Sequence, residues 1–167
     1  MQHRCARVAV GPATVRGQRT GGVVEAARTY LATIDLRQFG TSSAPLFRRR
    51  LDRATETMAR ALPRGAQSWG VARKLLNIFL LQALYTHYLR KTFRLDRAEH
   101  LFELPIDSII AKQLRGKAGR GALPRWRGVK RISPEVSIQY QAAAAAIAAA
   151  RGIARVHLDA FWWGSRR

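Results

Sequence analysis

The chain has 167 residues, which is enough for one domain with a substantial hydrophobic core. Apolar residues make up 47% of it, which excludes a chain that is disordered throughout. Lysine and arginine number 30 against 10 acidic residues, so the formal net charge is +20. We therefore expect a polyanionic partner, with nucleic acid ahead of an anionic membrane surface. The alternative is a basic surface that merely keeps the protein soluble.

Residues 1–22 are rich in arginine and glycine and contain no acidic residue. They lack the apolar core of a secretory signal, and we interpret them as a basic flexible arm, although an organelle transit peptide has a similar composition. Cys5 is the only cysteine, which excludes a disulfide within the chain and a four-cysteine metal or iron–sulfur site. A reducing compartment fits this usage, and we expect a cytoplasmic, nucleoid-associated protein.

Two amphipathic helices are predicted next. Apolar residues at helical spacing indicate the first at 23–34 and the second at 46–62. The second carries five arginines on its outer face, which form a solvated face or follow a phosphate backbone; these are Arg48, Arg49, Arg50, Arg53 and Arg60. The stretch 63–68, with Pro63 and Gly65, ends this helix.

The most apolar helix of the chain is predicted at about 71–92. Its apolar residues occupy nearly the whole circumference, so we expect it to be buried on most sides. The longest apolar run within it, 75–89, is short and contains polar residues, so it does not indicate a transmembrane helix, and we expect no membrane partner.

The rest of the chain, from residue 93 on, is predicted to be largely helical as well. A short helix or turn at 95–102 and an extended stretch at 103–107 precede a helix that Asp107 is suited to cap. A basic loop covers 115–131, and a helix begins at Ser133 and Pro134 and ends near Gly152. The apolar tail at 156–163 is expected to dock on the core. The fold class is therefore all-α, a compact bundle of about six or seven helices, with residues 23–167 as one domain.

One lysine stands out in the central helix. Gly70 lies before the predicted helix, where unpaired backbone N–H groups and the helix dipole form a seat for phosphate, with Arg73 beside it. Lys74 follows in the first turn, and partial burial among positive charge lowers the pKa of a lysine toward that of a nucleophile. A lysine that reaches from a helix start into solvent is the plainer alternative. Asp107, as a capping residue, is held and aimed by backbone N–H groups, which a purely structural cap also explains.

Two motifs resemble the helix-hairpin-helix DNA glycosylases, the superfamily with a Gly/Pro-rich loop and a catalytic aspartate. The stretch G-V-A-R-K-L-L-N-I-F-L at 70–80 is similar to the family's hairpin G-V-G-R-K-x-x-N-x-x-L, and L-P-I-D-S-I-I-A at 104–111 is similar to its loop P-x-D-[TS]-x-[VI]-x-R. The likeness covers residues 69–114, about a quarter of the chain. Ala72 replaces the second hairpin glycine, and the cluster cysteines of the endonuclease III branch are absent. The spacing from lysine to aspartate is nearest to that of the 8-oxoguanine glycosylases.

The resemblance implies a helix-hairpin-helix element and the chemistry of a bifunctional glycosylase/lyase. Lys74 falls on the position of the Schiff-base lysine and Asp107 on that of the catalytic aspartate. The substrate would be duplex DNA with a lesion, the damaged nucleotide would be flipped into a pocket, and neither a metal nor a cofactor would be needed. The residues expected to contact DNA are Gly70, Ala72, Arg73, Arg64 and Lys112.

Aromatic side chains are available to stack on a flipped base, and each is also a candidate for the core or its rim; these are Trp69, Trp126, Trp162 and Trp163. His157 and Asp159 are interpreted as a hydrogen-bonded structural pair ahead of a catalytic one. The leading hypothesis is a monomeric base-excision glycosylase with AP-lyase activity, with an oxidised purine as the first substrate to test. One alternative is a non-catalytic helical DNA- or RNA-binding protein. Another is a cationic interaction protein, or part of a mobile-element or defence system, with no chemistry of its own.

Overall fold

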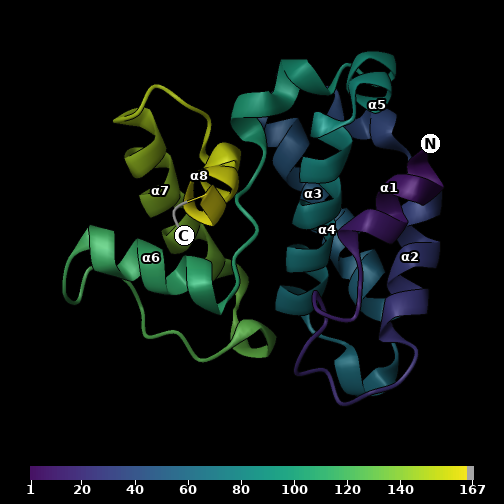
Figure 1. Ribbon diagram of the computed structural model, residues 1–167, viewed down its shortest axis with the longest axis horizontal. Coiled ribbons are helices and arrows are strands. Elements are labelled where there is room, and N and C mark those ends of the chain that lie inside the picture. Colours follow the sequence, from purple (N-terminus) through teal and green to yellow (C-terminus); the bar gives the residue numbers. More distant parts are fainter. Residues whose placement is uncertain (165–167) are drawn as a thin grey trace.

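All regular secondary structure in the computed structural model is helical within residues 1–164, the part of the chain that the structure describes, with side chains described for residues 1–162 (Figure 1). The predicted all-α class is confirmed. The α-helices are α1 (Gln2–Ala9), α2 (Val23–Thr33), α3 (Ala44–Ala61), α4 (Trp69–Tyr85), α5 (His87–Thr92), α6 (Ser108–Ala118), α7 (Pro134–Ala149) and α8 (Leu158–Gly164). Short 3-10 helices are η1 (Leu36–Phe39), η2 (Arg64–Ala66), η3 (Leu95–Leu101), η4 (Val129–Arg131) and η5 (Arg155–His157).

Two hydrophobic clusters divide the molecule. The first cluster is formed by buried side chains of α1 to α5, η1 and η3, together with Val156. The second cluster is formed by α6, α7, α8 and the segments that contain Leu104, Ile106, Leu123 and Ile132. Figure 1 shows the two groups of helices on either side of the extended segment 102–107, which joins them. The boundary between the clusters is therefore the natural place for a site.

Helix α4 is the centre of the first cluster. Its side chains are buried around most of the circumference, as the apolar pattern predicts, and it packs against α1, α2, α3 and α5. The predicted helix at 71–92 is interrupted, however, because Thr86 has an extended backbone with φ −82° and ψ 105°. The Thr86 hydroxyl donates to the Gln82 carbonyl at 2.8 Å, so it binds a carbonyl at the end of α4, and α5 continues as a separate helix.

The beginning of the chain differs from the expected basic flexible arm. Residues 2–9 form α1, whose buried residues Cys5, Ala6 and Ala9 pack toward α2 and α4. The Gln2 side chain donates to the carbonyls of Leu31 and Ile34 at 3.0 and 2.7 Å. The expectation is corrected for this stretch, because small and apolar residues at helical spacing gave α1 a buried face that the basic composition concealed.

The capping predictions are confirmed. One carboxylate oxygen of Asp107 accepts hydrogen bonds from the N–H groups of Ile109 and Ile110, both at 2.9 Å. Ser133 caps α7, and Gly152 follows it with a positive φ of 66°. The tail docks as expected, because Leu158 and Trp162 are buried in the second cluster. The helix-hairpin-helix element stays a prediction; the connection in question runs from α3 through η2 to α4.

Candidate active site

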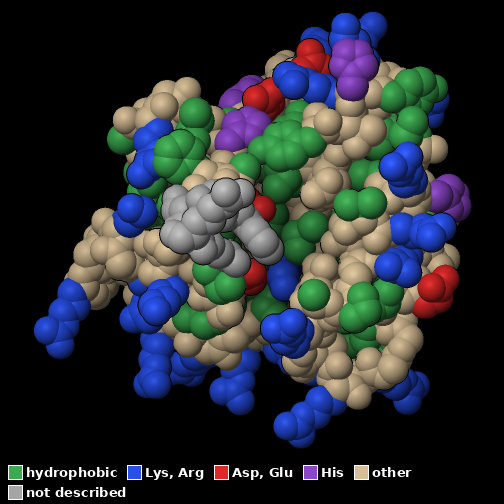
Figure 2. Space-filling model, in the orientation of Figure 1, with side chains coloured by type: hydrophobic (Ala, Val, Ile, Leu, Met, Phe, Trp, Pro, Cys, Tyr) green, Lys and Arg blue, Asp and Glu red, His purple; other side chains and the backbone are tan. Residues whose placement is uncertain are grey.

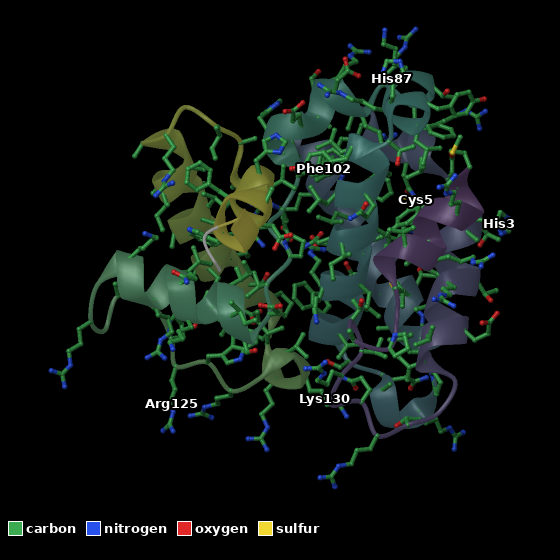
Figure 3. The ribbon with its side chains drawn as sticks, in the orientation of Figure 1. His3, Cys5, His87, Phe102, Arg125 and Lys130 are labelled. Carbon is green, nitrogen blue, oxygen red and sulfur yellow. The ribbon has the colours of Figure 1, made fainter. Side chains whose placement is uncertain are left out.

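A narrow pocket lies at the boundary between the two clusters. Helix α4 lines one side with Trp69, Lys74 and Asn77, and the other side comes from Ile106 and from α7. Its volume is about 10 Å³, which is room for about one water molecule. Lys74 therefore lines the pocket itself, whereas Asp107 directly follows the lining residue Ile106 and is not part of the lining. Figure 3 shows the side chains of α4 and of the extended segment that begins at the labelled Phe102.

Lys74 is half-buried beside this pocket. Its amine donates a hydrogen bond to the Thr14 carbonyl at 2.9 Å. Burial lowers the pKa of the amine below its ordinary value, and the negative charge of Asp107 opposes that effect. The two groups are 33 residues apart in the sequence, yet they lie near enough in space for one charge to act on the other. A lysine that simply extends into solvent would show neither the burial nor the carbonyl contact.

Asp107 is held from two directions. Its carboxylate is fixed by the first N–H groups of α6, as described above. The chain just before it is fixed by Gln141 of α7, whose amide donates to the Leu104 carbonyl at 2.8 Å and accepts from the Leu104 N–H at 3.0 Å. Sequence reasoning missed Gln141. The available signal was a glutamine on the face of an alanine-rich helix that Tyr140 and Ala144 bury.

Arg73 lies inside the protein and does not form the predicted DNA contact. It is 6% exposed, and its guanidinium forms a bidentate pair with Glu103 at 2.8 and 3.0 Å. It also donates to Thr55 at 2.8 Å and pairs with Asp52 at 2.9 Å. The physical reason is that Arg73 faces α3 and the extended segment, where acceptors bind every part of the guanidinium. Burial of Glu103 alone would raise its pKa, but the charge and hydrogen bonds of Arg73 outweigh this and hold the pKa below its usual range.

Gly70 and Ala72 are also buried, which corrects their assignment to the DNA surface. Gly70 lies within the first turn of α4, and a Cβ there would collide with the Val129 carbonyl and the Ile132 side chain. Ser68 caps this helix and donates to the Lys130 carbonyl at 3.0 Å. Close packing of the η4 region, and not approach of a phosphate, therefore explains the glycine, and the predicted phosphate seat is covered.

The three described tryptophan candidates occupy different places. Trp69 is half-buried at the pocket, with the Arg73 guanidinium 5.0 Å from its ring centroid. Trp126 meets Tyr140 edge-on at 6.0 Å, and Trp162 is buried in the second cluster. Trp69 is thus the one that lines the pocket beside Lys74. The side chain of Trp163 lies outside the described residues.

Exposed cations gather along one edge of the molecule. Figure 2 shows lysine and arginine side chains along the lower edge, where Figure 3 labels Arg125 and Lys130. Arg64 on η2 and Lys112 on α6 are exposed, as a role in DNA contact requires.

His157 connects three elements in a way that the sequence did not indicate. Its ring nitrogens bond to the Tyr85 hydroxyl at 2.8 Å and to a Glu99 carboxylate oxygen at 2.7 Å. Glu99 also pairs with Arg90 at 2.9 Å. The histidine therefore fastens η5 to α4 and η3, whereas the expected partner was Asp159.

Comparison with protein-family models, with curated proteins and with solved structures finds no match for the chain. No helix in residues 1–164 is both long and apolar enough to cross a membrane. Within the same residues, no group of three or more histidine, cysteine, aspartate or glutamate side chains is arranged to hold a metal ion. The functional assignment therefore depends on the geometry around Lys74 and Asp107.

Proposed function

We propose that the protein is a DNA repair glycosylase with AP-lyase activity, which removes a damaged base by Schiff-base chemistry of Lys74 assisted by Asp107. The observation that carries the proposal is the half-buried amine of Lys74, whose pKa is lowered by burial and which feels the charge of the helix-capping Asp107, as fits a nucleophile with a carboxylate nearby. The resemblance of residues 70–80 and 104–111 to the glycosylase motifs supports the same pair. In this proposal the protein is a cytoplasmic, nucleoid-associated monomer.

The reaction requires a lone pair on the Lys74 nitrogen. The amine attacks C1′ of the damaged nucleotide while the bond from C1′ to the base breaks. The nitrogen gives up two protons on the way to an imine, one to the departing base and one to the ring oxygen O4′ as the sugar ring opens. The Asp107 carboxylate stabilises the positive charge that develops on the sugar. Opening of the sugar ring gives an imine on Lys74, and loss of a C2′ proton then expels the 3′ phosphate by β-elimination. Each step balances without a metal or a redox cofactor.

The free protein must change before it can react in this way. A pocket of about 10 Å³ is far smaller than a purine, and the Lys74 amine is engaged by the Thr14 carbonyl. A flipped base would therefore require that the two clusters separate or that Trp69 move, with release of Lys74 at the same time. The cations along the lower edge, together with the exposed Arg64 and Lys112, would bind the phosphates of the duplex. The connection from α3 through η2 to α4 would be the hairpin element.

Borohydride trapping tests the proposal. Duplexes with an abasic site or with 8-oxoguanine are incubated with the protein and borohydride, and covalent adducts are separated by denaturing electrophoresis. We expect an adduct with the native protein, none with Lys74→Gln, and a reduced yield with Asp107→Asn. Lys117→Gln is the matched control, because it removes one exposed lysine of α6 and leaves the pocket intact. An adduct that persists in Lys74→Gln would refute the assignment of the nucleophile.

A non-catalytic helical protein that binds DNA or RNA is the second candidate. The closed pocket and the burial of Arg73 favour it, because a protein that only binds nucleic acid needs neither an open base pocket nor a guanidinium at the hairpin. Absence of an adduct with every lesion tested, together with salt-dependent duplex binding that Lys74→Arg leaves unchanged, would support this candidate over the enzyme.

A further inference from the structure

A second concentration of positive charge lies at the far end of the molecule from the basic lower edge. An open hollow of about 750 Å³ between α5 and η3 is lined by His87, Arg90, Lys91, Arg94, Asp96 and Arg97. Figure 3 labels His87 at the top, whereas Arg125 and Lys130 are labelled at the bottom. Figure 2 shows the same separation, with lysine, arginine and histidine side chains grouped at the top. The hollow is therefore distinct from the pocket at Lys74.

Most of the charge in the hollow is uncompensated. Arg90 is paired with Glu99, but Lys91, Arg94 and Arg97 form no ion pair with any residue in the described part of the chain. Asp96 is the one acidic residue of the lining. Like charges held together raise the energy of the free protein, and a polyanion that enters the hollow lowers it again. Residues 87, 90 and 91 lie along one side of α5, at the spacing of one helical turn, whereas Arg94 follows the end of the helix.

Arg94 stands in a strained backbone conformation. Its φ is 53° and its ψ is 39°, and within residues 1–164 it is the one residue other than glycine with a positive φ. Glycine would adopt this conformation without the clash of a Cβ, and an arginine there costs on the order of 1 kcal/mol. Strain of this kind gathers at functional sites, and here it presents a guanidinium to the hollow.

Two exposed aromatic rings lie near these cations along the chain, outside the lining of the hollow. Tyr88 is 60% exposed on α5, one turn before Lys91, and Tyr85 is exposed at the end of α4. The Tyr85 hydroxyl is hydrogen-bonded to His157, so Tyr88 is the ring that we expect to stack on a base. Cations that follow a phosphate backbone beside an aromatic ring that accepts a base are the combination by which proteins bind single-stranded nucleic acid. A duplex, with its bases stacked inside, would use the cations but not the ring.

We propose that the hollow between α5 and η3 is a second nucleic-acid site, which binds a single strand by its phosphates at Lys91, Arg94 and Arg97 and by one base on Tyr88. The site acts independently of the Lys74–Asp107 chemistry. With the lower edge on a duplex, it allows the protein to hold a duplex and a single strand at once.

Ternary binding tests the proposal. The protein is saturated with an uncleavable duplex that contains a tetrahydrofuran abasic analogue, and a fluorescent oligothymidylate of about six nucleotides, within the size of one binding site, is titrated by anisotropy. We expect the single strand to bind while the duplex stays bound. The variant Lys91→Gln/Arg94→Gln/Arg97→Gln should bind the single strand more weakly, and the slope of log affinity against log salt should fall in magnitude by about 2, which is roughly 0.7 per phosphate contact. Tyr88→Ala should weaken binding about tenfold with an unchanged slope.

The matched control is Arg49→Gln/Arg53→Gln/Arg60→Gln, which removes the same charge from exposed positions of α3. Equal loss in this control, displacement of the oligonucleotide by the saturating duplex, or no effect of Tyr88→Ala would overturn the proposal. Borohydride trapping on the abasic duplex is measured for the same variants and should be unchanged in the hollow variant. Failure of trapping would thus refute the proposed enzyme, and failure of ternary binding would refute the second site.

Discussion

Replacement of Glu103 by glutamine tests how strongly the ion-pair network under the pocket stabilises the fold. The change keeps the shape of the side chain and removes its charge. Arg73 then stays 6% exposed with Asp52 as its one remaining anion, at 2.9 Å. Loss of one partner from a buried ion pair costs about 3–5 kcal/mol. Because Asp52 is 45% exposed and can follow the guanidinium, we expect a value at the lower end, about 3 kcal/mol.

The assay is equilibrium unfolding by urea and by heat. For a chain of this length, about 3 kcal/mol corresponds to a decrease in Tm of roughly 6–12 °C. The pKa of Glu103 is held below its usual range in the folded protein, so its contribution is present above the unfolded pKa of about 4.3 and is lost as the pH falls through the lower, folded value. The variant should therefore lose less stability in acid than the native protein does.

Two further variants complete this test. Glu56→Gln, which removes an exposed acid from α3, should change the free energy of unfolding by less than about 0.5 kcal/mol. The double variant Arg73→Met/Glu103→Leu removes both buried charges and should recover most of the lost stability. A cost below about 1 kcal/mol for Glu103→Gln, or a double variant no more stable than Glu103→Gln, would refute the account of the network as a coupled unit.

Three other predictions address the site and the first cluster. Asp107→Asn keeps a good helix cap but removes the charge that raises the pKa of Lys74, so that pKa should fall further in a titration by NMR of ¹³C-methylated lysines; a rise would contradict the pairing. Gly70→Ala should cost about 1–3 kcal/mol in urea unfolding, because its Cβ meets the Val129 carbonyl, and unchanged stability would show that the η4 region packs elsewhere. Burial raises the pKa of the Cys5 thiol to about 11, which lowers the fraction of reactive thiolate. Alkylation at about pH 8 should therefore be about a hundredfold slower in the folded protein than in urea. Equal rates would show that α1 does not pack on the core.

Sequence patterns predicted the local structure well where one residue type has one physical role. Asp107 and Ser133 were recognised as helix caps because short polar side chains accept hydrogen bonds from the first N–H groups of a helix. The burial of α4 followed from apolar residues around its whole circumference. The proximity of Lys74 to Asp107 was suggested only by the order of the two motifs, since spacing along the chain does not specify distance in space.

The predictions that failed concern residue types that serve more than one structural or functional role. Arg73 looks like a phosphate ligand in the sequence, and only the position of Glu103, 30 residues later, makes it a buried structural cation. Gly70 looks like an open turn until the η4 region is seen against it. The same limit applies to residues 2–9, where basic side chains on the outer face hid a helix with a buried side. Each of these outcomes depends on a contact distant in sequence.

The two bonds from Gln141 to Leu104 give the alanine-rich helix an unexpected constraint. A run of alanines tolerates many substitutions, since it is helical by propensity alone and asks little of any single position. Here, however, the side-chain amide of Gln141 bonds to both the N–H and the carbonyl of Leu104 in the extended segment, as a neighbouring strand would. Adding or removing one residue between Pro134 and Gln141 would turn the amide by about 100° around the helix axis and break both hydrogen bonds. The exposed positions of this helix can therefore change, whereas its length and its buried positions are constrained.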